Sequence, residues 1–449
     1  MAFVQNTKED MRIVFASLGS LGDLHPLLTL ASAARARGHT AVIAASASYR
    51  EYVETLGFLF CRIRPDLEPK PASVEHLSHA RRGPERLLRE EVFPKVRETY
   101  ADLTAATHGA DILVVGELLY VAPLVAAKLG IPWANVILSP SSFLSACDPC
   151  VLAPAPALHV LRYFGRWPHR AIFALGRMLT ARWGAPLTQL RRELRLPDSG
   201  SAVFDGKHSP RLVLTMFPEF LAAPQADWPS QVVQTGFPFF SQPAQLAAAK
   251  DLESFLASGS PPIIFTLGST AVHIGRNFYQ AAADAARLLG RRAILLVGKT
   301  PPPAVSPEVL ALDYVPLAAI LPRCAAVVHH GGIGSCAEAL RAGRPSLIVP
   351  FGYDQPDNAE RMRSLGVARI LPRHRVTSKT IAAGLKVLLA DSNAVRQARK
   401  LAARMHPEAD LRRSLEAIEA LVAPEQTLPT RYSASEPRPT ELANPMMQP

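Results

Sequence analysis

The segment 329–338 combines a glycine turn with side chains that can hold an anion. It reads His-His-Gly-Gly-Ile-Gly-Ser-Cys-Ala-Glu, and it joins the apolar, strand-like run 325–328 to a helix-like run that ends at Gly343. A helix that begins there points free backbone N–H groups and roughly half a positive charge into the turn. Glycines let an anion approach the backbone, and His330 and Ser335 can donate hydrogen bonds. The segment predicts a site for a phosphorylated ligand, with an ordinary tight turn as the alternative.

The segment 19–26 offers a general base. It reads Gly-Ser-Leu-Gly-Asp-Leu-His-Pro, and we predict a turn here between a strand over 12–16 and a helix over 26–37. A carboxylate at the end of a strand can accept a proton from a ligand, so Asp23 is one candidate for a base. His25 is the second candidate, and an Asp23 that only forms the turn is the third interpretation. The turn lacks the Gly-x-Gly-x-x-Gly spacing of a dinucleotide site, which argues against a dehydrogenase.

Composition and charge exclude several classes of protein. The chain has 449 residues, enough for two cores, and a formal net charge of +11, which favours an anionic ligand or surface. No basic run alternates with aromatic residues and no zinc-finger spacing occurs, so no nucleic acid is expected as a partner. We interpret the five cysteines, including Cys147 and Cys150, as reduced thiols. We see no secretory signal and no uninterrupted apolar run of membrane-spanning length, so we expect a cytoplasmic protein.

A longer pattern around the glycine turn is similar to that of a known family. Its residues are Tyr314-Val315-Pro316, His330-Gly331-Gly332-Ile333-Gly334-Ser335, Glu338, Gly343, Pro345, Pro350, Asp354-Gln355 and Asn358. This pattern resembles the donor signature of family 1 glycosyltransferases with the GT-B fold. It is most similar to the bacterial branch that contains rhamnosyltransferase B and the antibiotic and sterol glucosyltransferases. The resemblance implies an α/β protein with two Rossmann-like, doubly wound parallel-sheet domains that face a cleft, and the alternation of strands and helices along the chain favours the same class.

The resemblance also implies roles for single residues. In that family the turn after the first strand carries the catalytic base, which falls on Asp23 here. The implied donor-binding residues are Ser269, Tyr314, Val315, His330, Gly331, Gly332, Gly334, Ser335, Glu338, Asp354 and Gln355. Tyr314 would lie near the nucleotide base and Glu338 at the ribose, while the glycine turn would hold the diphosphate. Asp354 and Gln355 would bond the sugar hydroxyls, because paired acceptor and donor groups suit a polyol.

Some positions depart from the family pattern, among them Gly334, where plant members have an asparagine, and Tyr314, where they have a tryptophan. Leu317 stands where the motif has a glutamine, which leaves recognition of the nucleotide base open. Gly116 and then Glu117 follow the strand after which plant members have an aspartate that orients their catalytic histidine. This last departure agrees with an Asp23 that acts without a relay partner, although Glu117 could still line the cleft.

Changes in composition divide the chain into parts. We expect residues 1–240 to form an acceptor-binding domain and 250–423 to form a nucleotide-sugar-binding domain, whose last helix crosses back as the resemblance implies. The linker should lie near 238–250. The segment 154–196 mixes arginines with large apolar residues, and we expect basic helices that cover an acceptor pocket or touch an anionic membrane, with ordinary surface helices as the alternative. The tail 424–449 is rich in Pro, Ser and Thr, and we expect it to be disordered.

These features together predict an inverting, metal-independent glycosyltransferase that moves a hexosyl group. Its donor would be a nucleotide-diphosphate sugar, UDP-glucose or dTDP-rhamnose, used as a co-substrate, and no cofactor is expected. Its acceptor would be the hydroxyl of a hydrophobic small molecule or lipid, reached in the cytoplasm or at the inner face of the membrane. No Asp-x-Asp motif occurs, so a metal-held diphosphate is not expected. A nucleotide-sugar epimerase and a non-catalytic partner protein of the same fold are the alternatives, and the sequence leaves the oligomeric state open.

Overall fold

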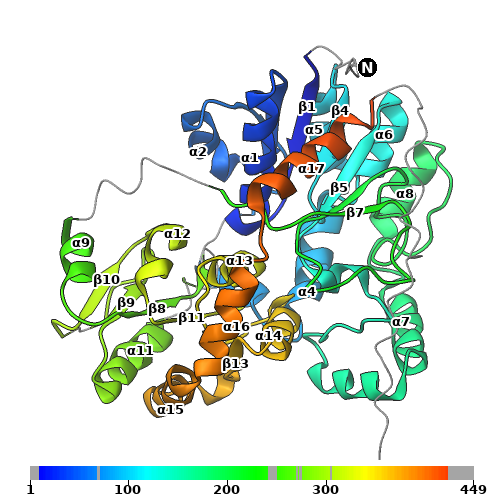
Figure 1. Cartoon of the computed structure of the whole chain (residues 1–449). Coiled ribbons are helices and arrows are strands. Elements are labelled where there is room, and N and C mark those ends of the chain that lie inside the picture. The colour runs from blue at the N-terminus through cyan, green and yellow to red at the C-terminus, as the bar shows by residue number, and fades with distance from the viewer. Residues whose placement is uncertain are drawn as a thin grey trace, which may run out of the picture.

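The computed structural model describes residues 10–67, 71–240, 250–268, 272, 276–303 and 306–422. Within them the chain forms two parallel sheets, one after the other along the sequence (Figure 1). The prediction of two doubly wound parallel sheets is therefore confirmed. Ser269, most of the expected linker and the expected disordered tail lie outside the described residues.

The first sheet has seven strands in the order β3-β2-β1-β4-β5-β6-β7. They are β1 (Arg12–Ala16), β2 (Thr40–Ala45), β3 (Leu59–Arg62), β4 (Ile112–Val115), β5 (Trp133–Ile137), β6 (Val213–Thr215) and β7 (Val232–Gln234). Neighbouring residues such as Val14 and Phe15 point to opposite faces, and both are fully buried because helices cover both sides of the sheet. The strand order reverses between β1 and β4, so residues that follow these two strands meet at the edge where parallel sheets usually bind ligands.

Helix α1 begins earlier than predicted, and Asp23 lies in it. The helices of this half are α1 (Leu21–Ala36), α2 (Arg50–Thr55), α3 (Pro71–Leu77), α4 (Gly83–Arg86), α5 (Val96–Thr107), α6 (Ala122–Leu129), α7 (Trp167–Thr180) and α8 (Ala185–Glu193). The predicted start at residue 26 was wrong because Ser20 and Asp23 form a capping box. Pro26, which suggested that start, lies inside the helix, where it removes only the hydrogen bond to the carbonyl of Gly22. Asp23 is thus a helix residue rather than a turn residue.

The second sheet has six strands in the order β10-β9-β8-β11-β12-β13. They are β8 (Ile263–Thr266), β9 (Ala293–Leu296), β10 (Val309–Leu312), β11 (Ala326–His329), β12 (Ser346–Ile348) and β13 (Ala368–Ile370). Its helices are α9 (Lys250–Ala257), α11 (Arg276–Leu289), α12 (Leu317–Ile320), α13 (Ile333–Arg341), α14 (Gln355–Ser364), α15 (Ser378–Ala390), α16 (Ser392–Ala402) and α17 (Pro407–Glu419). The strand order reverses here between β8 and β11, and the glycine turn follows β11 directly.

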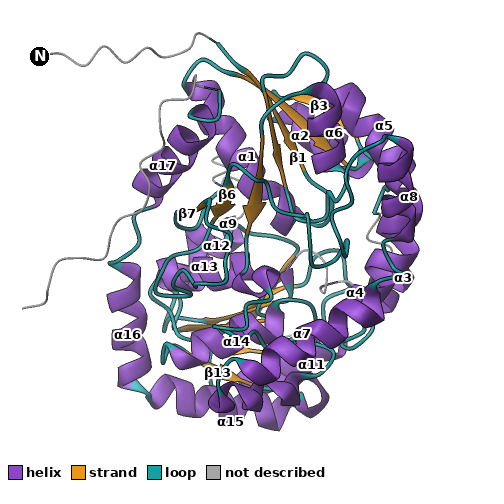
Figure 2. Ribbon diagram, turned by 90° about the vertical axis from the view of Figure 1, so that its right-hand side faces the viewer, coloured by secondary structure: helices purple, strands orange, loops and turns teal. Residues whose placement is uncertain are grey.

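Helix α17 returns from the second half to the first and packs on α1 (Figures 1 and 2). Leu415 and Ile418 belong to the same buried cluster as Leu27 of α1. At the end of α17, Glu419 accepts from Arg37 at 2.9 Å. The last described helix therefore ties the two halves together. The domain boundaries at 240, 250 and 423 stay predictions.

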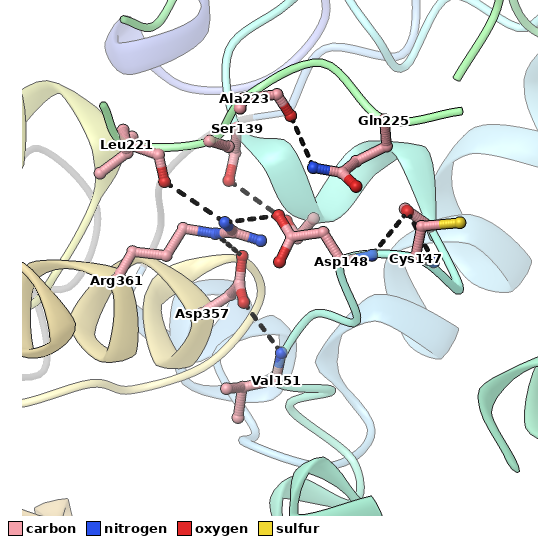
Figure 3. Close-up of polar contacts among 12 residues, drawn as sticks. Ser139, Cys147, Asp148, Val151, Leu221, Ala223, Gln225, Asp357 and Arg361 are labelled. Atoms are coloured by element: carbon pink, nitrogen blue, oxygen red, sulfur yellow. Dashed lines mark hydrogen bonds and ion pairs between the residues drawn. The ribbon is translucent and has the colours of Figure 1, made fainter. Parts of the chain in front are cut away.

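A polar network fixes a loop of the first half against α14 of the second (Figure 3). Arg361 of α14 donates to Asp148 of the loop at 2.8 Å and to Asp357 of its own helix at 2.8 Å. The other oxygen of Asp357 accepts from the backbone N–H of Val151 at 2.9 Å. Because Asp357 and Arg361 are almost wholly covered, these contacts hold α14 and the loop in a defined position.

Candidate active site

Asp23 is held at the start of α1, where Oδ2 of its carboxylate is hydrogen-bonded and Oδ1 is available to a ligand. The backbone N–H and the hydroxyl of Ser20 donate to Oδ2 of Asp23, at 2.7 and 2.9 Å. No other residue that the structure describes donates a hydrogen bond to Oδ1. Burial raises the pKa of Asp23 above its usual value, and the hydrogen bonds from Ser20 offset part of that rise. A fixed carboxylate with a free oxygen and a raised pKa suits a general base.

Replacing Ser20 by alanine tests how the cap controls this carboxylate. The variant loses the hydroxyl that donates to Asp23 and accepts from the N–H of Gly22, so we expect about 1 kcal/mol less stability. The pKa of Asp23 should rise further. A base acts in its deprotonated form. As the pH is lowered, the rate of the variant should therefore begin to fall at a higher pH than the rate of the wild type. Thr377→Ala is the control, since Thr377 forms a similar capping box on α15, and an equal pH shift in both variants contradicts the prediction.

Asp23 lies close to two further carboxyl groups where the two halves meet. Burial, together with the charges of Asp23 and Glu117, raises the pKa of Asp354 to about 7, although a hydrogen bond from Asn358 opposes the rise. Asp23 and Glu117 follow β1 and β4, which are neighbours in the first sheet, whereas Asp354 precedes α14 in the second half. The structure therefore brings the expected base together with an expected sugar-binding residue.

Glu117 is the third carboxyl group, and sequence reasoning gave it no defined role. Its Oε1 accepts from the backbone N–H of Leu138 at 3.2 Å. Burial raises its pKa, and the nearby charge of Lys207 offsets part of the rise. Lys207 also donates to the backbone carbonyl of Ser142 at 2.7 Å. The signal that could have found Glu117 is its place two residues after β4, at the edge of the sheet where ligands bind.

Asn358 joins the glycine turn, Asp354 and the first half of the chain. Its amide nitrogen donates to the carbonyl of Gly331 at 3.0 Å and to Oδ2 of Asp354 at 2.6 Å. Its amide oxygen accepts from the hydroxyl of Ser139, in the first half, at 3.0 Å. Asn358 is completely buried, so every polar atom of its side chain is used inside the protein. The family pattern contained Asn358, but its position in the sequence did not reveal these three partners.

His330 lies in a slot that two glycines leave open. A Cβ atom at Gly268 or Gly332 would stand 2.5 or 2.4 Å from an atom of the His330 ring, so neither position accepts a larger residue without displacing the ring. Burial lowers the pKa of His330 to about 4, and the ring is neutral at neutral pH. Its buried Nδ1 has no hydrogen-bond partner among the described residues. A neutral ring fixed in this way can present one N–H to a ligand.

The first turn of α13 is open behind the glycine turn. Gly331 has a φ of +88°, the left-handed region that favours glycine, and this conformation turns the chain from β11 into the helix. Nothing lies within 4 Å of the place where a Cβ of Gly334 would stand, and Ser335 is partly exposed. The free N–H groups at this helix end therefore face space that an anion can occupy.

Tyr314 and Glu338 lie close together beside the glycine turn, as the donor signature implies. Tyr314 is 59% exposed. Partial burial raises the pKa of its hydroxyl, and the nearby charge of Glu338 raises this pKa further. Glu338 keeps a partner of its own, because its Oε2 accepts from Arg341 at 2.7 Å. The side chain of Val315 is buried in the core, so only its backbone could contact a nucleotide.

Gln355 has its amide oxygen occupied and its amide nitrogen available. The oxygen accepts from the backbone N–H groups of Phe351 and Gly352, at 2.8 and 3.2 Å. These bonds orient the side chain at the start of α14. No described residue accepts from the NH₂ group, which can donate to a ligand, while the neighbouring Asp354 can accept.

His25 points to a different set of side chains from Asp23. Its Nε2 lies 3.0 Å from the hydroxyl of Tyr52, and its ring stacks on Phe240 with the centroids 4.9 Å apart. Residues two positions apart on a helix do not share a face, which explains the separation. Burial lowers the pKa of His25 to about 4. The structure thus places Asp23, rather than His25, with the other carboxyl groups.

The described residues show features of neither a metal site nor a membrane span. They contain no group of three or more His, Cys, Asp or Glu side chains arranged to hold a metal ion. None of the described helices has both the length and the apolar character that a membrane span requires.

The sequence is similar to those of known glycosyltransferases. Residues 299–421 match the family model of the erythromycin biosynthesis protein CIII-like C-terminal domain. Over 406 residues the chain is 32% identical to the O-mycaminosyltylonolide 6-deoxyallosyltransferase of Streptomyces fradiae, covering 87% of this chain and 93% of that protein.

Solved structures show the same fold at lower identity. The glycosyltransferase of kitacinnamycin superposes with a TM-score of 0.68 at 21% identity, covering 92% of this chain and 99% of that one. The spinosyn rhamnosyltransferase SpnG complexed with thymidine diphosphate superposes with a TM-score of 0.65 at 20% identity, covering 90% of this chain and 100% of that one. The fold is GT-B, and the chain belongs to the family 1 glycosyltransferases, in their antibiotic-type bacterial branch.

Proposed function

We propose that the chain is an inverting glycosyltransferase that uses no metal and moves glucose or rhamnose to a hydroxyl of an apolar acceptor. The observation that carries the proposal is the meeting of Asp23 with Asp354 beside the glycine turn of α13. This arrangement can hold an anionic leaving group on one side and a base on the other. The donor would be UDP-glucose or dTDP-rhamnose, and a structural neighbour with thymidine diphosphate bound supports a nucleoside diphosphate.

The proposed reaction is one displacement at the anomeric carbon. Asp23 takes the proton of the acceptor hydroxyl while its oxygen attacks the sugar from the side opposite to the diphosphate, so the configuration inverts. The C–O bond to the diphosphate breaks, and the N–H groups of α13 with the ring of His330 stabilise the departing oxyanion. Asp354 and Gln355 hold the sugar hydroxyls. Because these groups stabilise the leaving group, the reaction needs no metal, and a chelator should leave the rate unchanged.

The acceptor side of the proposal rests on the first half. The segment 154–196 mixes arginines with large apolar side chains, which suits an apolar acceptor better than a polar sugar chain. The proposal includes contact with an anionic membrane, where apolar acceptors dissolve. With such contact the protein would act at the inner surface of the membrane as well as in the cytoplasm.

A panel of nucleotide sugars tests the donor. UDP-glucose or dTDP-rhamnose should raise the melting temperature of the protein, since a ligand that binds only the folded state stabilises it. The free sugars and the nucleoside monophosphates should have little effect. Transfer is then measured with the stabilising donor and a set of hydroxylated acceptors. If no nucleoside diphosphate sugar raised the melting temperature, the donor site proposed here would be wrong.

His330→Ala should weaken binding of the nucleoside diphosphate by about 1–3 kcal/mol, the usual cost of a lost hydrogen bond to a charged group. The effect should concern the diphosphate, so affinity for the nucleoside alone should stay the same. Isothermal titration with UDP, dTDP and the two nucleosides measures both quantities. His374→Ala, at an exposed position of the second half, is the control. Equal affinities of wild type and variant for the diphosphates would remove His330 from the site.

A further inference from the structure

An exposed apolar surface gathers on one part of the first half. The described residues contain eleven exposed large apolar side chains, and seven of them lie between residues 160 and 179. We call these seven the docking face, and they are Val160, Tyr163, Phe164, Trp167, Leu175, Met178 and Leu179. They lie on the 3-10 helix η5 (Pro156–Phe164) and on α7. Clusters of this kind on a protein surface usually mark an interaction site.

Helix α7 is apolar on two sides, but the protein covers only one of them. His169 and Phe173 are buried, and Gly176 lets the helix approach the ring of Phe204, because a Cβ there would stand 3.0 Å from it. Trp167 and Met178 lie on the other side and are 68% and 70% exposed. A helix with a single apolar stripe can bury that stripe against its own domain. The second stripe of α7 therefore needs another surface.

The charges around the docking face select an anionic partner. The 44 residues from 149 to 192 contain seven arginines and no aspartate or glutamate. Arg166 and Arg170 lie beside the ring of Trp167, at 5.9 and 5.0 Å from its centroid. Neither of them has an ion-pair partner among the described residues. Their charges are thus available next to the exposed aromatic side chains.

We propose that the docking face binds the surface of an anionic membrane. Trp167, Tyr163 and Phe164 would enter the boundary between lipid headgroups and acyl chains, and the arginines would contact the anionic headgroups. A second copy of this chain fits less well. A two-fold contact would set Arg166 and Arg170, which lie beside the docking face without an ion-pair partner among the described residues, against their own copies.

Membrane contact would bring the acceptor to the sugar site. Arg162 of η5 pairs with Glu360 of α14 at 3.4 Å, and α14 is the helix that begins with Gln355 after Asp354. One ion pair therefore links η5, which carries part of the docking face, to the helix that begins at the expected sugar-binding residues. Delivery of the acceptor rests on the proposed function, because it assumes an apolar acceptor dissolved in the bilayer. Binding of the docking face to lipid does not depend on that function.

Vesicle binding tests the docking face without donor or acceptor. The full chain should sediment with vesicles of phosphatidylcholine and phosphatidylglycerol, and much less with phosphatidylcholine alone. The double variant R166A/R170A should bind the anionic vesicles about 30-fold more weakly, at the usual contribution of an arginine near such a surface. R396A/K400A is the matched control, since it removes two exposed basic residues with the same spacing from α16, and it should bind as the wild type does.

Tryptophan fluorescence tests the depth of insertion. Trp133 and Trp228 are buried and Trp183 is partly buried, whereas Trp167 is 68% exposed, so brominated lipids should quench mainly Trp167, and W167F should lose most of that quenching. Absence of binding to anionic vesicles at low salt would overturn the proposal, as would equal binding of R166A/R170A and the control. A dimer that dissociates on W167A/M178A would also overturn it, because the face would then be a contact between copies. Transfer to a water-soluble acceptor, measured separately, shows whether the proposed function stands when lipid binding fails.

Discussion

Asp23→Asn is expected to lower the rate of transfer by about a thousandfold while affinity for the donor stays nearly unchanged. The amide is the same size as the carboxylate, and its oxygen can still accept from Ser20, so the start of α1 should stay folded. What the variant loses is the ability to take a proton from the acceptor. Single-turnover rates and a separate titration of the nucleotide sugar distinguish loss of chemistry from loss of binding.

Two further variants make this test specific. Asp284→Asn removes a carboxylate from the surface of α11 and should be as active as the wild type. His25→Ala addresses the rival base, and it should keep most of the activity because His25 lies against Tyr52 and Phe240. If His25→Ala lost activity and Asp23→Asn kept it, the two roles would have to be exchanged.

The pH dependence of the wild type follows from the same carboxylate. Transfer requires deprotonated Asp23, so the rate should rise with pH through the pKa of this group. Because burial raises that pKa, the rise should occur at higher pH than for an exposed aspartate. Because burial raises the pKa of Asp354 to about 7, binding of the donor should show a second pH dependence near neutral pH. A rate that stays flat down to pH 4 would contradict the role of Asp23.

The fold and the glycine turn could be predicted because their signals are local. Apolar runs such as 12–16 and 325–328 are near-continuous, as strands buried on both faces require, and Gly331 needs its left-handed conformation whatever surrounds it. The start of α1 was missed because Pro26 suggested the first turn more strongly than the capping box at Ser20 and Asp23.

The partners across the two halves could not be predicted, because they depend on how separate segments meet. Glu117 stands 90 positions before Lys207 in the sequence, and only the folded chain shows that their charges interact. The same holds for Ser139 and Asn358, which stand 219 positions apart. Spacing within one segment shows which side chains share a face, but it carries no information about the surface that packs against them.

Asn358→Ala is expected to reduce both stability and donor affinity, for one reason. The variant removes one of the two partners of the Gly331 carbonyl and one of the two partners of the Ser139 hydroxyl, and it removes the side-chain donor to Asp354. Buried polar groups that lose a partner typically cost about 1–3 kcal/mol each, so we expect a loss of about 2–5 kcal/mol in the free energy of unfolding. Denaturant titration measures this loss.

The effect on the donor separates a role in the site from a role in folding alone. The hydrogen bond from Asn358 lowers the pKa of Asp354, so without it that pKa should rise above about 7 and the carboxyl should stay protonated to higher pH. Asn135→Ala is the matched control, because Asn135 is also buried and bonded, to His208 and Ser209, but lies within the first sheet. Both variants should be less stable, yet only Asn358→Ala should move the pH dependence of donor binding. If the two moved it equally, or neither did, Asn358 would serve folding only, and Asp354 would not depend on it for its charge.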